Sequence, residues 1–167
     1  MAKYNELLVE AFDRAAGEYP DKTAIIYLGE KYTYAHLTQL IDRFATGLHE
    51  LGIKKDDKLM LYIPNCPQFI IAYFGAHRIG AIPVPVSPLY TPHEMEYLIN
   101  DSEAETVLCL DTNFRYIQEV FPRTCLKRVI ITTYDEMISL YKRFIGFLFD
   151  KVPTGAIEKG PTIYLFK

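Results

Sequence analysis

One stretch of the sequence comes near a motif for phosphate chemistry. Gly155-Ala-Ile-Glu-Lys-Gly160-Pro161-Thr162 almost fits the phosphate-loop pattern G-x-x-x-x-G-K-[ST]. That loop binds phosphate through backbone N–H groups, a lysine and the helix that follows it. Here Pro161 replaces the lysine, and no helical pattern follows. We therefore expect a flexible connecting segment in this place and no phosphate loop.

Two other side chains have types and positions that suit a binding or reactive role. Arg115 follows a predicted strand that ends at Leu110, and ligands of open α/β sheets bind beyond the carboxyl ends of strands. It is a candidate phosphate contact, with an ordinary solvated arginine as the alternative. Cys66 precedes Pro67 at a predicted helix start, where the helix dipole lowers the pKa of a thiol. The simpler interpretation is a packed, unreactive thiol.

The sequence offers no metal-binding pattern. The four histidines, His36, His49, His77 and His93, have no i, i+4 pairing and no carboxylate at a metal-site spacing. We expect each of them on a helix surface. The three cysteines are odd in number and lack metal spacing, which favours a reducing, cytoplasmic location.

Composition excludes several classes of protein. The 167 residues carry a net charge of −3, whereas a nucleic-acid-binding domain usually has a basic face. No window approaches the roughly 18 apolar residues of a membrane span, and the first residues lack the apolar core of a signal peptide. Half of the residues are hydrophobic, which is enough for a substantial core.

The elements that position these residues are clearest around residues 78–100. Gly80 follows an apolar helical run and suits a helix end, because glycine adopts positive φ without steric cost. Residues 81–86 read as a strand, and Pro83 and Pro85 remove two N–H groups from the same side of it. We therefore expect a sheet edge, a strand end or a sharp exit there. Thr91 and Glu94 form a predicted capping box with Pro92 at the first helical position.

Helical and strand patterns alternate along the rest of the chain. Residues 24–28 and 31–34 suggest a hairpin, while the apolar runs 58–63 and 106–110 suggest strands buried on both faces. The alternation predicts an α/β fold, a twisted mostly parallel sheet with helices on both faces. A further strand is expected at 129–132. Helices are expected at 5–17, 34–51, 68–79 and 134–150, and another runs from Asp111-Thr112 to Val120. The expected caps are Thr33 for the helix at 34–51, Asn65 for the helix at 68–79 and Asp111-Thr112 for the helix that ends at Val120. Residues 151–167 show little periodicity.

The order of the motifs resembles the adenylate-forming superfamily, specifically the AMP-forming acyl-CoA synthetases such as long-chain fatty-acid–CoA ligases. The resemblance covers residues 18–132 in order and spacing. The matching pieces are Tyr19-Pro-Asp-Lys-Thr-Ala24, Tyr32-Thr-Tyr-Ala-His-Leu37, Gly52-Ile-Lys-Lys-Asp-Asp57, Pro64-Asn-Cys-Pro-Gln-Phe69, Gly75-Ala-His-Arg-Ile-Gly-Ala-Ile-Pro-Val-Pro85, Pro88-Leu-Tyr-Thr-Pro-His-Glu94 and Asn100-Asp-Ser-Glu-Ala104. Asp56 departs from the family's glycine, and Asp tolerates a left-handed turn.

The resemblance implies an enzyme that uses ATP, Mg²⁺ and CoA. In that family a carboxylate attacks ATP to give an acyl-adenylate, and the CoA thiolate then displaces AMP. The family's phosphate loop, adenine and ribose contacts and catalytic lysine all lie beyond the matching region. We therefore expect residues 1–150 to be an N-terminal scaffold subdomain that is inactive alone. Residues 151–167 would then link it to the phosphate-loop subdomain.

The resemblance also implies a binding residue and partners. In acetyl-CoA synthetases of this family, arginines in the loop after the matching strand contact the CoA phosphate, and Arg115 falls near that place. The expected partners are the remaining subdomains of a longer parent chain, and a homodimer through an exposed apolar face is a further expectation. The acid would be fatty or aromatic. The alternatives are a non-catalytic α/β binding module and the adenylation domain of another adenylate-forming enzyme.

Overall fold

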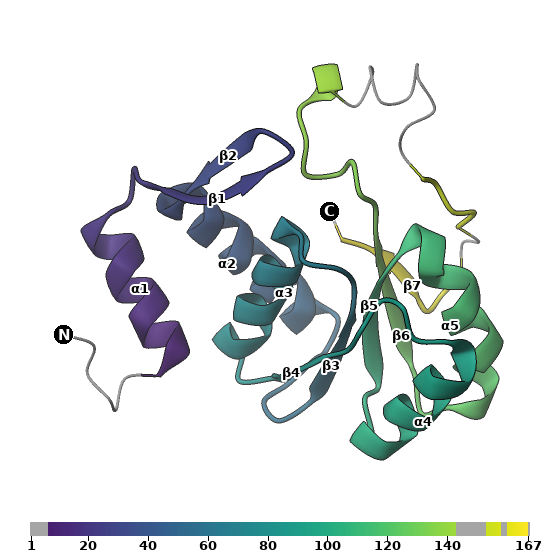
Figure 1. Ribbon diagram of the computed structural model, residues 1–167. Helices are drawn as coiled ribbons and strands as arrows, with labels where there is room; N and C mark the ends of the chain where they lie inside the picture. The colour runs from purple at the N-terminus through teal and green to yellow at the C-terminus, as the bar shows by residue number, and fades with distance from the viewer. Residues whose placement is uncertain (1–6, 143–152, 158–159, 167) are drawn as a thin grey trace.

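The chain folds around a five-stranded sheet in which all neighbouring strands are parallel (Figure 1). The computed structural model describes residues 7–142, 153–157 and 160–166. The predicted α/β fold is confirmed. In spatial order the strands are β4 (Ile82–Pro85), β3 (Lys58–Tyr62), β5 (Thr106–Leu110), β6 (Arg128–Thr132) and β7 (Ile163–Leu165).

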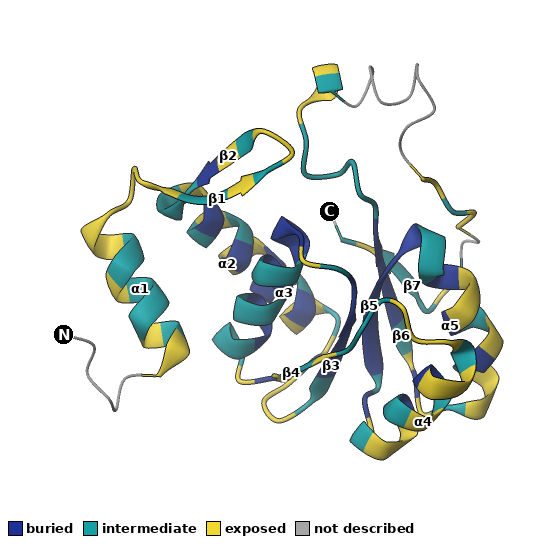
Figure 2. Cartoon of the chain, in the orientation of Figure 1, coloured by how far each residue is buried: buried dark blue, intermediate teal, exposed yellow. Residues whose placement is uncertain are grey.

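Helices cover both faces of this sheet. On one side lie α1 (Leu8–Glu18), α2 (Tyr34–Glu50) and α3 (Pro67–Arg78), and on the other α4 (Pro92–Ser102) and α5 (Phe114–Val120). Successive side chains of a strand point to opposite faces. On β3, Leu61 therefore joins the core on the α2–α3 side, and Tyr62 joins the core on the α4–α5 side. Figure 2 shows the resulting burial of the central strands.

The predicted edge strand and capping box are both present. Among the described strands, β4 pairs with β3 alone. The N–H groups of Ile82 and Val86 bond to the β3 side, so the two intervening prolines remove no hydrogen bond from this pairing. At the start of α4, the Thr91 N–H donates to Glu94 Oε2 at 2.8 Å, and the Glu94 N–H donates to Thr91 Oγ1 at 3.5 Å. Residues that are neighbours in the sequence thus determine both the edge strand β4 and the start of α4.

The hairpin before α2 also forms as predicted. β1 (Thr23–Tyr27) pairs antiparallel with β2 (Glu30–Thr33), and the Thr33 hydroxyl accepts the N–H of His36 at the start of α2. Asp56 has a φ of 68°, the left-handed conformation expected of it where the family prefers glycine.

Two predicted helix caps are wrong. Asn65 does not cap α3, because Cys66 occupies the N-cap position. Asp111 does not cap α5, which begins only after the 3₁₀ turn η1 (Asp111–Asn113); a second such turn, η2 (Phe121–Arg123), follows α5. The Asp111 carboxylate instead accepts the N–H groups of Thr112 and Gly155.

The helix predicted over 134–150 is wrong in its first part. Residues 134–137 form turns, and helix begins only at 140; the part from 143 lies outside the described residues. The β1–β2 hairpin supplies the reason. The Tyr32 hydroxyl donates to the Met137 carbonyl, and Glu30 accepts the Ser139 N–H. These bonds use backbone groups that a helix would have paired within itself.

Strand β7 was not predicted, because three residues carry too little pattern to be recognised. It adds to the sheet beside β6, with Tyr164 opposite Ile130. The strand belongs to residues 151–167, so part of this segment belongs to the sheet, and its role as a linker stays a prediction.

Candidate functional site

A buried glutamine of α3 binds the end of strand β6 at the carboxyl edge of the sheet. Gln68, in the first turn of α3, is 0% exposed. Its Nε2 donates to Thr132 Oγ1 at 3.2 Å and to the Thr133 carbonyl at 2.9 Å. Thr132 Oγ1 in turn donates to Glu136 Oε2 at 2.5 Å. Gln68 Oε1 has no hydrogen-bond partner among the residues that the structure describes. The network fixes the loop after β6 against α3.

A buried carboxylate lies at the same edge, beyond β5. Asp111 is 4% exposed, and its two oxygens accept the N–H groups of Thr112 and Gly155, each at 2.8 Å. Gly155 lies so close that a Cβ there would sit 2.0 Å from the Asp111 carbonyl oxygen. A side chain is therefore excluded at residue 155. Gly155, the first glycine of the stretch that resembles a phosphate loop, thus donates its N–H to a carboxylate. The chain after this stretch forms strand β7, and a helix was not expected there.

Two further hydrogen bonds hold the loop between β4 and α4. The Tyr62 hydroxyl donates to the Tyr90 carbonyl at 2.5 Å, and Asn113 Nδ2 donates to the Pro88 carbonyl at 2.8 Å. Burial raises the pKa of the Tyr62 hydroxyl, which keeps it a neutral donor. Together with the Gln68 and Asp111 contacts, these bonds connect the loops at the carboxyl edge of the sheet, and we call this edge the platform.

Arg115 lies in the first turn of α5, just after this edge, and its side chain is exposed. No hydrogen bond or ion pair holds it within the described chain. Its position agrees with a cation that faces outward from the platform, and a contact with the CoA phosphate stays a prediction.

The thiol and histidine candidates behave as structural residues. Cys66 is 7% exposed, and burial raises the pKa of its thiol despite the nearby N–H groups of Gln68 and Phe69. The packed thiol is therefore the correct interpretation. All four histidines lie on helices and are exposed or half-buried, as expected. Within the described ranges, no three histidine, cysteine or acidic side chains gather as a metal site would need.

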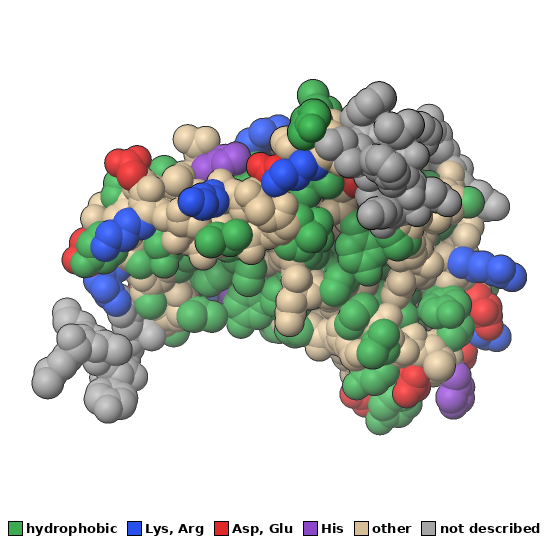
Figure 3. Space-filling model, turned by 45° about the horizontal axis from the view of Figure 1, so that its top comes forward, with side chains coloured by type: hydrophobic (Ala, Val, Ile, Leu, Met, Phe, Trp, Pro, Cys, Tyr) green, Lys and Arg blue, Asp and Glu red, His purple; other side chains and the backbone are tan. Residues whose placement is uncertain are grey.

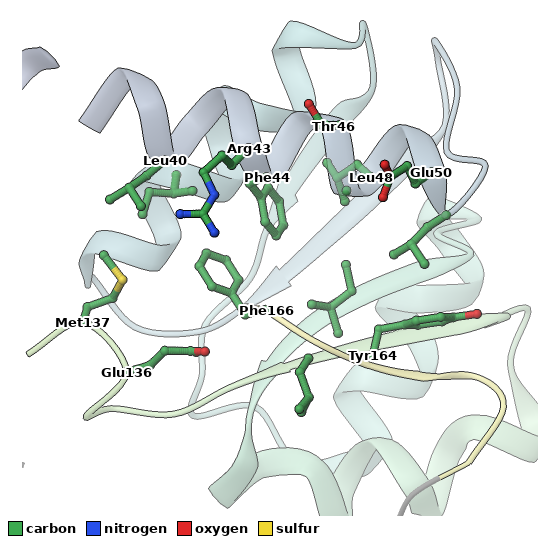
Figure 4. Close-up of a pocket in the computed structure, with 15 residues that line it drawn as sticks. Leu40, Arg43, Phe44, Thr46, Leu48, Glu50, Glu136, Met137, Tyr164 and Phe166 are labelled. Carbon is green, nitrogen blue, oxygen red and sulfur yellow. The ribbon is translucent and has the colours of Figure 1, made fainter. Parts of the chain in front are cut away.

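Sequence reasoning missed a groove of about 880 Å³ between α2 and the end of the sheet. Figure 3 shows hydrophobic side chains exposed across the middle of one face, with charged side chains towards its rim. In Figure 4 the Phe44 and Phe166 rings face each other inside the groove; their centroids are 4.7 Å apart. Its walls are mostly apolar, and Arg43, Glu50 and Glu136 are its charged groups. We call this surface the α2–β7 groove.

The described residues form a platform at the carboxyl edge and a groove beside β7. Within the described residues, no helix is long and apolar enough to cross a membrane. The arrangement can support bound groups on its carboxyl edge and pack against another surface at the groove.

Comparison with known proteins gives this architecture a family context. A family model described as "AMP-binding enzyme" matches residues 12–145. The chain is 38% identical over 136 residues to a long-chain-fatty-acid–CoA ligase of Salmonella typhimurium, and 30% identical over 141 residues to the one of Bacillus subtilis. These matches cover 81% and 84% of this chain but 24% and 25% of the relatives. The chain therefore spans about a quarter of the length of the curated relatives it matches.

A solved structure supports the fold. The crystal structure of a long-chain-fatty-acid–CoA ligase from Archaeoglobus fulgidus superposes with a TM-score of 0.74. It covers 99% of this chain and 35% of that one, at 22% identity. The likeness confirms the arrangement of strands and helices described above.

Proposed function

Because the chain belongs to the AMP-binding enzyme family, we propose that it is the N-terminal α/β part of an AMP-forming carboxylate–CoA ligase. The family match over 134 residues, from 12 to 145, carries this proposal. The acid would be fatty or aromatic, and the names of the curated relatives favour the fatty class. The free cysteines at 66, 109 and 125 suit a cytoplasmic location.

The proposed reaction has two steps. The carboxylate of the acid attacks the α-phosphate of ATP and forms an acyl-adenylate with release of pyrophosphate. The thiolate of CoA then attacks the acyl carbon, and AMP leaves. When bound, Mg²⁺ balances the charge of the phosphates. We assign the binding of ATP and Mg²⁺ to the phosphate-loop segments, which the family resemblance puts beyond the matching region.

The proposed role of this chain is to position other parts. The platform built by Gln68, Asp111 and Tyr62 would form one wall of the cleft for the acyl and CoA groups. Arg115 fits a phosphate of CoA, since it is an exposed cation beside that platform. In this proposal residues 1–150 are the scaffold subdomain, and residues 151–167 connect it to the next one.

The proposal predicts that the 167-residue chain by itself does not form an acyl-adenylate. We expect no ATP–pyrophosphate exchange by the 167-residue chain with a panel of fatty and aromatic acids, because the phosphate-binding loop is needed for the first step. The Salmonella typhimurium ligase is the positive control. Exchange above the buffer blank by the purified chain would contradict the scaffold role.

The reading frame beyond codon 167 separates the proposal from a free-standing binding module. A frame that continues into a Ser/Thr/Gly-rich loop with a lysine supports the ligase. A native stop codon supports the non-catalytic alternative.

A further inference from the structure

Helix α1 is attached to the rest of the fold less firmly than the other helices. None of its 11 described residues is buried, whereas α2, α3, α4 and α5 each bury at least two. Figure 1 shows α1 at the outer end of the helix layer, and it contacts α2 and α3. An element with so little buried surface can open by itself while the core stays folded.

Phe12 makes the aromatic contacts between α1 and the neighbouring helices. Its ring centroid lies 4.6 Å from that of Phe74 on α3 and 5.9 Å from that of Tyr34 on α2. All three side chains are half-buried. Helix α1 therefore covers an aromatic surface formed by Tyr34 and Phe74, which we call the Tyr34–Phe74 patch.

An ion pair of the next residue holds α1 against α3. Arg78 Nη1 and Nη2 donate to the two carboxylate oxygens of Asp13, each at 2.6 Å. Such a bidentate pair is strong and directional. The side chains of Asp13 and Arg78 are 41% and 25% exposed, so dissolved salt can screen the pair. Arg78 Nε also lies 3.2 Å from Asp42 Oδ1, but Asp42 belongs to α2 and does not attach α1.

The turn that follows α1 is bonded to the start of α2. The Tyr34 N–H donates to the Lys22 carbonyl at 3.0 Å, and the Ala35 N–H donates to the Pro20 carbonyl at 2.9 Å. Helix α1 ends at Glu18, before both of these contacts. Release of α1 therefore breaks neither bond, and the turn can act as a hinge while the hairpin and α2 keep their places.

We propose that α1 is a hinged lid over the Tyr34–Phe74 patch, which opens as one unit and which the Asp13–Arg78 ion pair holds closed. Opening separates Phe12 from the patch and breaks this ion pair. It leaves the fully buried residues of both cores in place, because α1 contributes none of them. Since salt weakens a solvent-exposed ion pair, a higher ionic strength shifts the lid towards its open state.

Hydrogen exchange of the 167-residue chain tests the lid without any need for turnover. The exchange rates of the backbone amides of α1 are compared with those of β5, whose five residues are all buried. The test variant is Asp13→Asn, which keeps the size of the side chain and removes its charge. The matched control is Asp42→Asn, which removes the other carboxylate beside Arg78 and leaves α1 unchanged.

The expected result is a selective effect on α1. In the parent chain the α1 amides should exchange faster than those of β5, because the lid opens without the sheet. Asp13→Asn should raise the α1 rates roughly fivefold, the effect of one partly exposed ion pair, and leave the β5 rates unchanged. Asp42→Asn should change neither set. At constant pH, a rise in NaCl from about 0.05 M to about 0.5 M should speed α1 exchange in the parent more than in Asp13→Asn.

Several results would overturn the proposal. Exchange of α1 as slow as that of β5 would mean that α1 opens only when the whole chain unfolds. Equal effects of Asp13→Asn and Asp42→Asn on α1 would show that the Asp13 pair does not hold the lid. A rise of the α1 and β5 rates by the same factor in Asp13→Asn would indicate a loss of global stability instead. If the variants do not fold, the salt series on the parent decides, and the absence of a selective rise in α1 exchange there would refute the lid.

Discussion

Asp111 and Gly155 form a close contact between two parts of the chain that are 44 positions apart. The carboxylate is buried and accepts the Gly155 N–H, and the backbones touch where a side chain would otherwise be. This contact draws residues 153–157 over the carboxyl edge of the sheet. It therefore helps to set the path of the chain into β7.

Replacement of Gly155 should disrupt that path. Gly155→Ala would put a Cβ 2.0 Å from the Asp111 carbonyl oxygen, so the segment must move and the buried carboxylate loses a donor. We expect a loss of about 2 kcal/mol in the free energy of unfolding, measured with urea. The control is Gly160→Ala, whose nearest neighbour is a methyl group of Ile163 at 3.5 Å. Equal stability of the two variants would contradict the contact.

Glu94 gives the capping box of α4 a predictable response to pH. The N–H and hydroxyl of Thr91 donate to its carboxylate and hold its pKa below the ordinary value of 4.5. A carboxyl whose pKa is lower in the folded state stabilises the fold above its unfolded pKa. That contribution is lost as the pH falls through the folded pKa.

The charge of Glu94 can be removed while its shape is kept. Glu94→Gln should be less stable than the parent near neutral pH, and the difference should shrink as the pH falls below 4.5. Urea unfolding at a series of pH values measures it. A stability difference that stays constant from pH 7 to the acid end of the series would show that the charge has no part in the cap.

At the scale of elements, the packing of α2 on α3 depends on a glycine. A Cβ at Gly75 of α3 would lie 2.8 Å from a ring carbon of Phe44 on α2 and 3.4 Å from the Ile41 carbonyl. Glycine costs a helix about 1 kcal/mol relative to alanine, so its presence in α3 is explained by this close approach. The same Phe44 ring stacks on Phe166 in the α2–β7 groove.

Two alanine substitutions separate helix propensity from packing. Gly75→Ala should destabilise the chain by about 1–3 kcal/mol, because the added methyl group overpacks the helix interface. Gly47→Ala, in α2, meets nothing within 4 Å and should stabilise by about 0.5–1 kcal/mol. Thermal unfolding of both variants measures the contrast. Stabilisation by both substitutions would mean that the helices are not held this closely.

At the scale of the whole molecule, the two ends of the sheet differ. The β4 edge is closed to further strands by its prolines, whereas the β7 edge is flanked by grooves on both faces. The homodimer expected from the sequence would use an exposed apolar face, and light scattering of the 167-residue chain measures whether it forms.

The sequence alone determined the elements whose signals are local. The caps at Thr33 and Thr91, the left-handed turn at Asp56 and the proline-protected edge strand each depend on residues within a few positions of one another. Alternation of strands and helices then limits the possible sheets to a few, which is why the parallel α/β fold could be predicted. The order of the short motifs likewise identified the family, because each motif consists of residues that are close together in the sequence.

Only the tertiary structure decided the features that join distant residues. The Gln68 amide meets Thr132 and Thr133 across 64 and 65 positions, and Gly155 meets Asp111 across 44. The hairpin converts the start of the predicted final helix into turns, because Tyr32 and Glu30 bond to its backbone. Strand β7 and the groove beside it exist only once β6 is in place, since three residues form a strand through pairing and not through their own preference.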